Sequence, residues 1–387
     1  MKEKVLVFNG YYIPAKNYGG PTASLATIVQ HCGDEFDFYI IAANHDLNET
    51  KIFDNIHEGW NQVGKAKVLY VDLSEINYHT KRIKRLLIDL KPDLVWLMGI
   101  LVPGDKWFVS KACRDLNIPY LISPRGEVCE NAFKTKFVKK VLVTSGARAL
   151  NVFQSAWYHT TSIEEKNGLL KYFNVSENRV FLVPNIPSNI IAHVRIIEKN
   201  PGEIKIIYVS RIHRIKNLHL AIQAVNQMKC DVVFDIYGPL EDEDYWMHCK
   251  EEISKAPANA SITYKGTLER EKVSSTISKY HCLLLPTSTE NFGHVIAEAL
   301  SVCCPVIISK GTTPWDSVDE KAGFVCDLGN IGQFVRALER ISRMNNTEYL
   351  EFMTSVGVYY NRKMKENDAV EGHLRMMKEI IEKHAQK

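Results

Sequence analysis

The chain has 387 residues, 45% of them hydrophobic and 24% charged, and its formal net charge at pH 7 is +3. This composition is typical of a globular protein with a large core and excludes an intrinsically disordered chain. The length predicts two or three domains, and the small charge gives no indication of a nucleic-acid partner, so none is predicted.

Short apolar runs alternate with helical patterns through the first half of the chain. Their length and their content of Val, Ile, Leu and Tyr favour buried parallel strands covered on both faces. The expected strands are residues 5–10, 36–43, 67–72, 93–99 and 119–123, and the expected helices include residues 21–32 and 81–90. This alternation predicts an N-terminal, Rossmann-like, doubly wound α/β domain over residues 1–184.

A second α/β series follows a break. Residues 185–202 contain Pro187, Pro201 and Gly202 with little regular periodicity, and they are predicted to be a linker. A second Rossmann-like domain is expected over residues 203–345, and helices over residues 346–387 are expected to pack back toward the N-terminal domain. The expected strands here are residues 204–210, 232–238, 261–266, 282–286, 305–309 and 324–327.

Two doubly wound domains predict a ligand site at the carboxyl ends of their strands, in a cleft where the domains face each other. The segment from Thr289 to Leu300 follows an expected strand and opens a helix. Gly293 lets the backbone approach a ligand closely, and the first N–H groups of the helix are free to meet an anion. Glu290 and Glu298 are expected to face this site at different depths. The alternative is an ordinary loop with a capping carboxylate.

Cationic side chains are needed beside those carboxylates if a phosphate is to bind. Arg211 and Lys216 follow the first strand of the second half and precede its helix. Arginine forms bidentate bonds to phosphate oxygens, and a lysine at a helix start opposes the helix dipole unless an anion is present. These residues therefore indicate a diphosphate site. The alternative is a pair of solvated bases on a loop.

Six segments, taken together, resemble family 4 glycosyltransferases, the retaining glycosyl transferases group 1 with the GT-B fold. The resemblance extends over most of the chain, from residue 5 to about residue 345. The segments are Tyr18-Gly19-Gly20, Ser123-Pro124-Arg125-Gly126, Val183-Pro184-Asn185, Ser210-Arg211 with Lys216-Asn217, the Glu290/Glu298 pair, and Gly311-Thr312-Thr313-Pro314-Trp315.

The resemblance implies a role for each matching position. Arg211 and Lys216 would stabilise the leaving diphosphate, Glu290 would bind the transferred sugar, and Glu298 would accept hydrogen bonds from the ribose. Further donor-binding positions would be Gly19, Gly20, Asn291, Phe292, Gly293, His294 and, against the base, Leu268.

One position departs from the pattern of many family members. Arg125-Gly126 stands where many carry His-Gly, and arginine cannot act as a base at neutral pH. Arg125 is therefore predicted to contact the acceptor or a phosphate. The alternative is an ion pair with Glu127 or another nearby carboxylate, and Glu127 itself is a weaker candidate for an acceptor contact.

The sequence thus predicts a retaining hexosyltransferase of surface polysaccharide biosynthesis that uses a UDP- or GDP-linked sugar donor, with no cofactor and no metal. The acidic triplet Asp242-Glu243-Asp244 is expected to be solvated loop surface. The alternatives are a nucleotide-sugar epimerase, a sugar-phosphate synthase of the same fold, and a non-catalytic partner that binds sugar nucleotides.

Two basic stretches bear on the acceptor and on location. Lysines and an arginine lie among apolar residues over residues 133–150, and four bases lie over residues 81–85. Such stretches indicate weak contact with an anionic membrane surface and a lipid-linked glycan acceptor, or simply basic exposed helix faces. Nine cysteines without metal-site spacing favour buried thiols in a reducing compartment. The expected location is the cytoplasm, including the inner face of the membrane.

Overall fold

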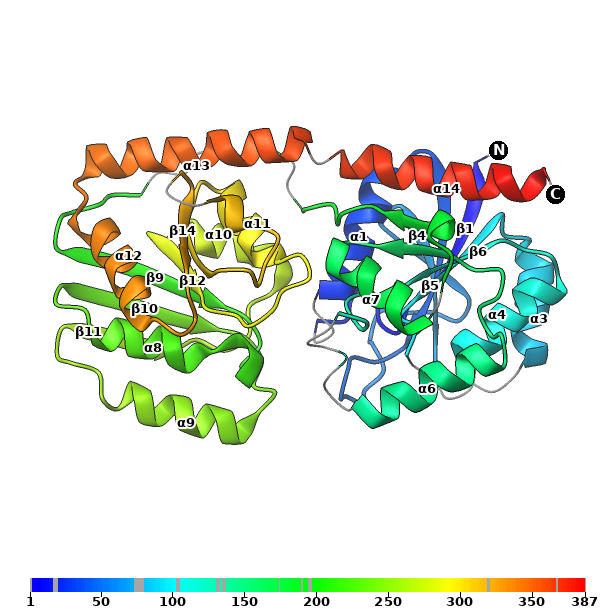
Figure 1. Cartoon of the computed structure of the whole chain (residues 1–387), viewed down its shortest axis with the longest axis horizontal. Coiled ribbons are helices and arrows are strands. Elements are labelled where there is room, and N and C mark those ends of the chain that lie inside the picture. Colours follow the sequence, from blue (N-terminus) through cyan, green and yellow to red (C-terminus); the bar gives the residue numbers. More distant parts are fainter. Residues whose placement is uncertain are drawn as a thin grey trace. The chain divides into compact units, whose positions relative to one another are not determined.

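The computed structural model describes residues 2–16, 20–72, 80–101, 105–129, 133, 137–173, 175–188, 191–193, 197–318, 321–366 and 368–386. The chain forms two compact units. Unit 1 is Met1–Ile186 with Asp368–Lys387, and unit 2 is Pro187–Asn367. Each unit is a sheet covered by helices (Figure 1).

Unit 1 contains an eight-stranded sheet in the order β3-β4-β2-β1-β5-β6-β7-β8. Every pair of neighbours is parallel except β3 with β4, so helices must connect most of the strands. The strands are β1 (Glu3–Phe8), β2 (Phe36–Ala43), β3 (Trp60–Val63), β4 (Ala66–Val71), β5 (Leu94–Met98), β6 (Tyr120–Ser123), β7 (Trp157–Thr160) and β8 (Val180–Leu182).

Alternate residues of β1 enter separate hydrophobic clusters on the two faces of this sheet. Val5 and Val7 pack with residues of α1 (Gly20–Cys32) and α14 (Ala369–Ala385), whereas Leu6 packs with residues of α3 (Thr80–Leu90) and α4 (Asp105–Asp115). Other helices in the described part of unit 1 are α6 (Phe137–Ala149), α7 (Ile163–Phe173) and the 3-10 turn η1 (Glu177–Arg179).

Unit 2 contains six parallel strands in the order β11-β10-β9-β12-β13-β14, around a single large core. The strands are β9 (Glu203–Val209), β10 (Asp231–Tyr237), β11 (Ala260–Tyr264), β12 (Cys282–Leu285), β13 (Val306–Ser309) and β14 (Gly323–Cys326). The helices are α8 (Leu218–Asn226), α9 (Glu243–Ile253), α10 (Val273–Ile277), α11 (His294–Ser301), α12 (Ile331–Arg343) and α13 (Asn346–Glu366), with turns η2 (Arg214–Lys216), η3 (Arg270–Lys272) and η4 (Asp316–Val318).

The prediction of two parallel-sheet α/β domains is confirmed, and each expected strand is present within a residue or two. Three strands were not predicted. β3 is an antiparallel edge strand with polar residues at its centre, and β7 (Trp-Tyr-His-Thr) and β8 (three residues) are too short and too mixed to give an apolar run.

The segment expected to be a linker, residues 185–202, contains packed residues where the structure describes it, at residues 185–188, 191–193 and 197–202. Residues 185–186 belong to unit 1 and residues 187–202 to unit 2. Lys199 is buried, and its Nζ donates to the backbone oxygens of Asn200 (2.6 Å) and Ser342 (2.9 Å). The expected C-terminal helical region consists of α13, which lies in unit 2, and α14, which lies in unit 1.

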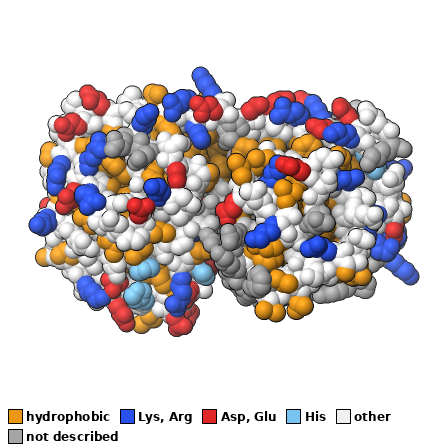
Figure 2. Space-filling model, viewed as in Figure 1, with side chains coloured by type: hydrophobic (Ala, Val, Ile, Leu, Met, Phe, Trp, Pro, Cys, Tyr) orange, Lys and Arg blue, Asp and Glu red, His pale blue; other side chains and the backbone are white. Residues whose placement is uncertain are grey.

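The cysteines, the lengths of the helices and the surface charge bear on the class of protein. All nine cysteines are free thiols, and eight of them are buried. Within the described residues, no helix is both long enough and apolar enough to cross a membrane. On the face drawn in Figure 2, acidic and basic side chains are interspersed, as expected for a small net charge.

Candidate functional site

The loops that follow the carboxyl ends of β9, β12 and β13 meet at one edge of the sheet in unit 2. The backbone N–H of Ser288, after β12, donates to the Ile215 oxygen after β9 at 2.8 Å. The N–H of Glu290 donates to the Thr312 oxygen after β13 at 2.7 Å. The parallel topology therefore brings residues about 75 and 100 positions apart in sequence into one constellation.

An ion pair lies at the centre of this constellation. Lys216 Nζ is 2.5 Å from Glu290 Oε1 and 3.4 Å from the Thr289 backbone oxygen. Lys216 is 7% exposed and Glu290 is half-buried. Because an ammonium has three N–H donors, one donor of Lys216 is left to reach an anion. The predicted proximity of a cation and a carboxylate is present in the geometry.

Asn217, the next residue, fixes the loop that presents Lys216. It adopts the left-handed conformation (φ 50°, ψ 40°), which asparagine tolerates better than most residues. Its Nδ2 donates to the Pro286 oxygen at 2.9 Å and to Ser288 Oγ at 2.8 Å. This amide therefore joins the β9 and β12 loops. Its place in the Lys216-Asn217 pair was noted from the sequence, but this clamp was not predicted.

An aromatic cluster packs against the loop that leads into α11. Phe292 is buried and packs edge-on against Trp315, whose Nε1 donates to the Phe292 oxygen at 2.5 Å. Gly293 has φ 75° and serves as the residue before the helix. Asn291 and His294 are half-buried on either side. The aromatic packing thus fixes the loop that leads into α11, and the buried Phe292 side chain is not available to a ligand.

Arg211 lies at the same edge but is held by another carboxylate. Its Nη1 is 2.6 Å from Glu241 Oε2, and the Arg211 side chain is 50% exposed. The loops after β9 and β10 pack closely, since a Cβ on Gly238 would come within 1.8 Å of the Ser210 oxygen. The sequence did not predict Glu241 as a partner. Among the residues that the structure describes, no ion pair joins Arg211 to Glu290, whose cationic partner is Lys216.

Glu298 differs from Glu290 in being almost completely buried within α11, at 7% exposure. Burial raises the pKa of its carboxyl to about 7, while the Arg270 guanidinium and the Ser188 hydroxyl lower that pKa. Arg270 Nη2 also donates to Ser188 Oγ at 2.8 Å. Neither Arg270 nor Ser188 was identified from the sequence. Leu268, the expected contact for the base, is half-buried against the core of unit 2.

The prediction that Asp242-Glu243-Asp244 is solvated loop surface is wrong in part. Asp242 is the N-cap of α9, and its Oδ1 accepts from the Tyr245 N–H at 2.9 Å. Its Oδ2 accepts from Arg214 Nε at 2.9 Å. The Tyr245 N–H is the largest cause that lowers the pKa of Asp242. The cap and helix dipole account for these acids.

Arg125 lies after the carboxyl end of β6 in unit 1, in the left-handed region (φ 55°). Its Nη1 donates to Ser24 Oγ at 2.9 Å and to Asn185 Oδ1 at 3.1 Å. Of the alternative, an ion pair with a nearby carboxylate, the structure shows only that the charge of Arg125 acts on the buried carboxyl of Glu165. That carboxyl is buried, which raises its pKa, and Arg125 opposes the rise.

The two neighbouring carboxylates support the backbone around Arg125. Glu165 accepts from the N–H groups of Gly126 and Thr161, and Glu127 Oε2 accepts from the N–H groups of Ile100 (2.7 Å) and Leu101 (2.9 Å). Glu127 therefore holds the loop after β5, which accounts for it without an acceptor contact.

The glycine-rich loop after β1 is represented here by Gly20, the exposed first residue of α1. Gly19, also expected to bind the donor, lies outside the described residues. Across the part of the chain that the structure describes, no group of three or more His, Cys, Asp or Glu side chains is placed to hold a metal ion.

Part of this chain matches a family model and the sequences of two other proteins. The family model described as glycosyl transferases group 1 matches residues 189–353. The human alpha-1,3/1,6-mannosyltransferase ALG2 is 26% identical over 149 residues, which are 35% of this chain and 36% of that protein. The sulfoquinovosyl transferase SQD2 of Arabidopsis thaliana is 24% identical over 153 residues, 38% of this chain and 28% of that protein. The matches thus span about a third of the length of these relatives.

Solved structures extend the likeness to the whole chain. A sucrose-phosphate synthase from Thermosynechococcus elongatus superposes with a TM-score of 0.70 at 12% identity, covering 100% of this chain and 99% of the other. Anabaena HepE in complex with UDP-glucose gives 0.70 at 12% identity, covering 99% of this chain and all of the other. The GT-B fold expected from the sequence is confirmed.

Proposed function

We propose that this chain, whose residues 189–353 match the family model described as glycosyl transferases group 1, is a retaining glycosyltransferase. It transfers a hexose-type sugar from a UDP- or GDP-linked donor to a glycan or lipid-linked glycan acceptor, as in surface polysaccharide synthesis. The observation that carries the proposal is the Lys216–Glu290 pair at the strand ends of unit 2, beside the backbone N–H groups at the start of α11.

In this proposal the cations act on the leaving group. The bond between the anomeric carbon and the diphosphate oxygen breaks, and negative charge grows on that oxygen. Lys216, with its remaining N–H donor, and Arg211, after leaving Glu241, meet this charge together with the N–H groups of the α11 start. One such preorganised donor is typically worth about 3–4 kcal/mol of transition-state stabilisation.

The acceptor oxygen attacks from the same face that the diphosphate leaves. A new bond forms between that oxygen and the anomeric carbon, and the acceptor proton passes to the departing phosphate oxygen. This route retains configuration and needs no protein base on the opposite face. In this proposal Glu290, held by Lys216, binds hydroxyls of the transferred sugar, and Glu298, further along α11, accepts hydrogen bonds from the nucleotide ribose.

The reaction is proposed to run without a divalent metal because Arg211 and Lys216 supply positive charge at the diphosphate. Metal dependence is checked directly by assaying turnover in excess EDTA, with Mg²⁺ restored in a parallel sample. Equal rates agree with the proposal, and loss of activity in EDTA that Mg²⁺ restores contradicts it.

The acceptor proposal rests on α6 of unit 1. Val138 and Leu142 are 71% and 68% exposed on this helix, and Leu150 just beyond it is 67% exposed. Lys139 and Arg148 are exposed beside them. An exposed apolar stripe flanked by bases suits the interface of an anionic membrane, where each base contributes about 1 kcal/mol. This membrane contact, like a cytoplasmic location, stays a proposal.

Flotation with phosphatidylglycerol vesicles tests that contact. The double variant Val138→Glu with Leu142→Glu is expected to abolish vesicle binding. Ile52→Glu, which changes another exposed apolar residue of unit 1, is the matched control and is expected to bind as the wild type does. Wild-type protein that stays in solution at low salt would refute the membrane contact and leave the transferase proposal intact.

A product assay separates the proposed activity from its alternatives. A transferase releases free nucleotide only when an acceptor is present and forms a product whose anomeric configuration, read by NMR, matches the donor. A sugar-phosphate synthase does so only with a phosphorylated sugar as acceptor. An epimerised donor, or no nucleotide release with any acceptor, would support the epimerase or the non-catalytic binding partner instead.

A further inference from the structure

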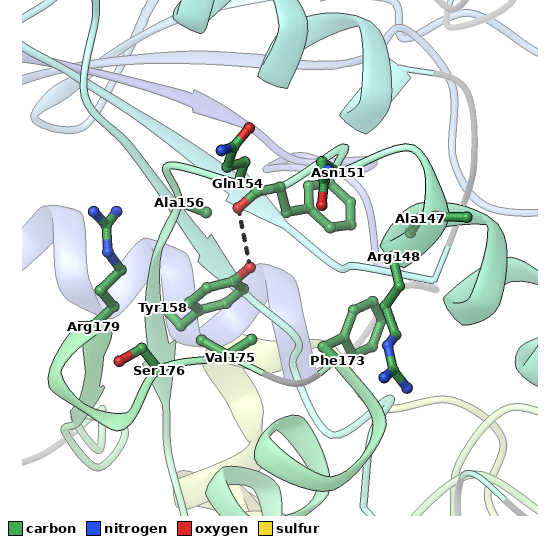
Figure 3. Close-up of a pocket in the computed structure, with 12 residues that line it drawn as sticks. Ala147, Arg148, Asn151, Gln154, Ala156, Tyr158, Phe173, Val175, Ser176 and Arg179 are labelled. Atoms are coloured by element: carbon green, nitrogen blue, oxygen red, sulfur yellow. Dashed lines mark hydrogen bonds between the residues drawn. The ribbon is translucent and has the colours of Figure 1, made fainter.

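A cavity of about 640 Å³ lies in unit 1 at the amino ends of β7 and β8 (Figure 3). It forms where the chain passes from α6 into β7 and from α7 into β8. Arg125 follows the carboxyl end of β6, so the cavity lies at the opposite edge of this sheet. It is therefore distinct from the donor site in unit 2 and from the surroundings of Arg125, and it shares Arg148 with the exposed face of α6.

The cavity has a buried floor and a polar rim. The rings of Tyr158 and Phe173 are buried, and the Tyr158 hydroxyl donates to the Phe153 backbone oxygen at 3.4 Å. Amide, hydroxyl and guanidinium groups surround this floor. The rim residues are Arg148, Asn151, Gln154, Ser176 and Arg179. An apolar floor with a few polar groups is the usual composition of a small-molecule site, and its volume is within the usual range.

The charged residues that line the cavity are all positively charged. Arg179 lies on one side of Tyr158, and Arg148 lies beyond Phe173 on the other (Figure 3). None of the twelve lining residues is acidic. Neither arginine forms an ion pair with a carboxylate within the described residues. The nearby carboxylate of Glu177 is held by Lys166, with Nζ 2.6 Å from Oε1.

A third arginine, Arg114, adds positive charge next to the rim. Arg114 Nη1 donates to the Asn151 backbone oxygen at 2.9 Å, so it supports the loop that carries the rim amide. The guanidinium of Arg179 lies 5.4 Å from the centre of the Trp157 ring, which positions it without neutralising it. Positive charge gathered around a concave surface without a carboxylate is what an anionic ligand requires.

We propose that this cavity binds a phosphorylated sugar, with the phosphate held by Arg179 on one side and sugar hydroxyls accepting from Arg148 on the other. Guanidinium groups match the geometry of phosphate oxygens, and the rim groups of Asn151, Gln154 and Ser176 suit sugar hydroxyls. The sugar ring of the ligand lies over the apolar floor of the cavity. The proposal depends on unit 1 alone and stands or falls independently of the transferase activity.

Calorimetric titration of the full chain with glucose 6-phosphate at low salt tests the proposal. The double variant Arg148→Gln with Arg179→Gln is expected to bind at least about tenfold more weakly, because two charge-assisted contacts are lost. Arg85→Gln, which removes an exposed charge from α3 of the same unit, is expected to leave the affinity unchanged. Uncharged glucose is expected to show no binding.

Fluorescence gives a second readout, because a phosphate that draws Arg179 away from Trp157 changes the emission of that indole. The change is expected in the wild type and is expected to disappear in Trp157→Phe. A variant that is misfolded is recognised by its circular dichroism and melting temperature, and the single variants Arg148→Gln and Arg179→Gln then replace the double one.

Three outcomes would overturn the proposal. The first is absence of glucose 6-phosphate binding to the wild type, or equal binding to the double variant. The second is binding that survives in the double variant but is lost in Arg211→Gln with Lys216→Gln, which places the ligand at the donor site. The third is binding to phosphatidylglycerol vesicles through Arg148 and Arg179 with none to the soluble sugar, which makes the ligand a lipid headgroup.

Discussion

Glu290 and Glu298 belong to the same strand–loop–helix segment, yet they lie in opposite electrostatic settings. Glu290 is half-buried in the loop after β12 and is 2.5 Å from Lys216. Glu298 is buried within α11, where burial outweighs Arg270 and Ser188 and raises the pKa to about 7. One carboxylate is therefore paired directly with a lysine, and the pKa of the other is raised by its burial.

This difference predicts different roles for Glu290 and Glu298. A charged carboxylate held beside a cation suits contact with the sugar and phosphate on which charge develops. A carboxyl whose proton is exchanged near pH 7 suits neutral hydroxyl groups, since it can donate or accept a hydrogen bond. The following predictions test whether the two settings separate catalysis from nucleotide binding.

Lys216→Gln is expected to have the largest effect. It removes the cation that meets the leaving group, so turnover is expected to fall about 10²–10³-fold, as for loss of one preorganised donor. Steady-state kinetics with saturating donor measures the effect. Control measurements on Lys265→Gln, which removes an exposed lysine of the same unit paired loosely with Asp235, are expected to give near wild-type turnover.

Glu290→Gln is expected to reduce turnover strongly while the affinity for the nucleotide stays nearly the same. The amide oxygen still accepts from Lys216 Nζ, so the loop keeps its shape and only the charge is lost. Turnover comes from kinetics and the Kd of the free nucleotide from calorimetry. Parallel losses in both quantities would remove the contrast with Glu298.

Glu298→Ala is expected to do the reverse, weakening nucleotide affinity more than it slows the chemical step. The side chain lies within α11 and carries the predicted ribose contact. The same two measurements apply. A variant that binds nucleotide normally but turns over slowly would show that Glu298, and not Glu290, acts on the reacting group.

The raised pKa of Glu298 also predicts a pH dependence of stability. Between pH 4.5, the ordinary pKa of a glutamate, and about pH 7, the folded protein binds the proton and the unfolded chain does not. Stability from this group is therefore complete below pH 4.5 and is lost as pH rises toward 7, by up to about 3 kcal/mol. Glu298→Gln is expected to flatten that part of the profile in chemical denaturation, and an unchanged slope would contradict the shift.

Glu241→Gln is expected to have the smallest effect. It releases Arg211 from its ion pair at 2.6 Å, so a diphosphate no longer has to displace a carboxylate. Because the pair is largely exposed, the expected gain in nucleotide affinity is only a few-fold. Glu243→Gln, in the first turn of α9, serves as the control for charge alone. Weaker binding in Glu241→Gln would show that Glu241 positions Arg211 instead of competing for it.

The sequence predicted the elements that carry this site because their signals are local. The apolar runs of β9 and β12 mark strands, Gly293 marks the helix start, and Lys216 and Glu290 follow strand ends. That β9 and β12 are neighbours in the sheet follows from topology, which no local pattern contains. The need for cations beside the two carboxylates led to Arg211 and Lys216, and the resemblance to the family agreed with that pairing.

The surroundings of Glu298 and Arg211 could not be predicted from local patterns. Arg270 and Ser188 are 82 positions apart and meet only in the folded chain, and the pairing of Glu241 with Arg211 depends on how two loops pack. Asp242 did carry a signal, since an aspartate directly before a helical pattern is a common N-cap. β7 and β8 were missed because hydrogen bonding to neighbouring strands, more than apolar content, defines them.

The most direct test of the central claim is calorimetric titration with UDP, GDP, ADP and their sugar conjugates in excess EDTA, on the wild type and on Arg211→Gln with Lys216→Gln. We expect one nucleotide family to bind the wild type without metal and to bind the double variant at least about tenfold more weakly. No binding to the wild type, or binding that requires a divalent metal, would contradict it.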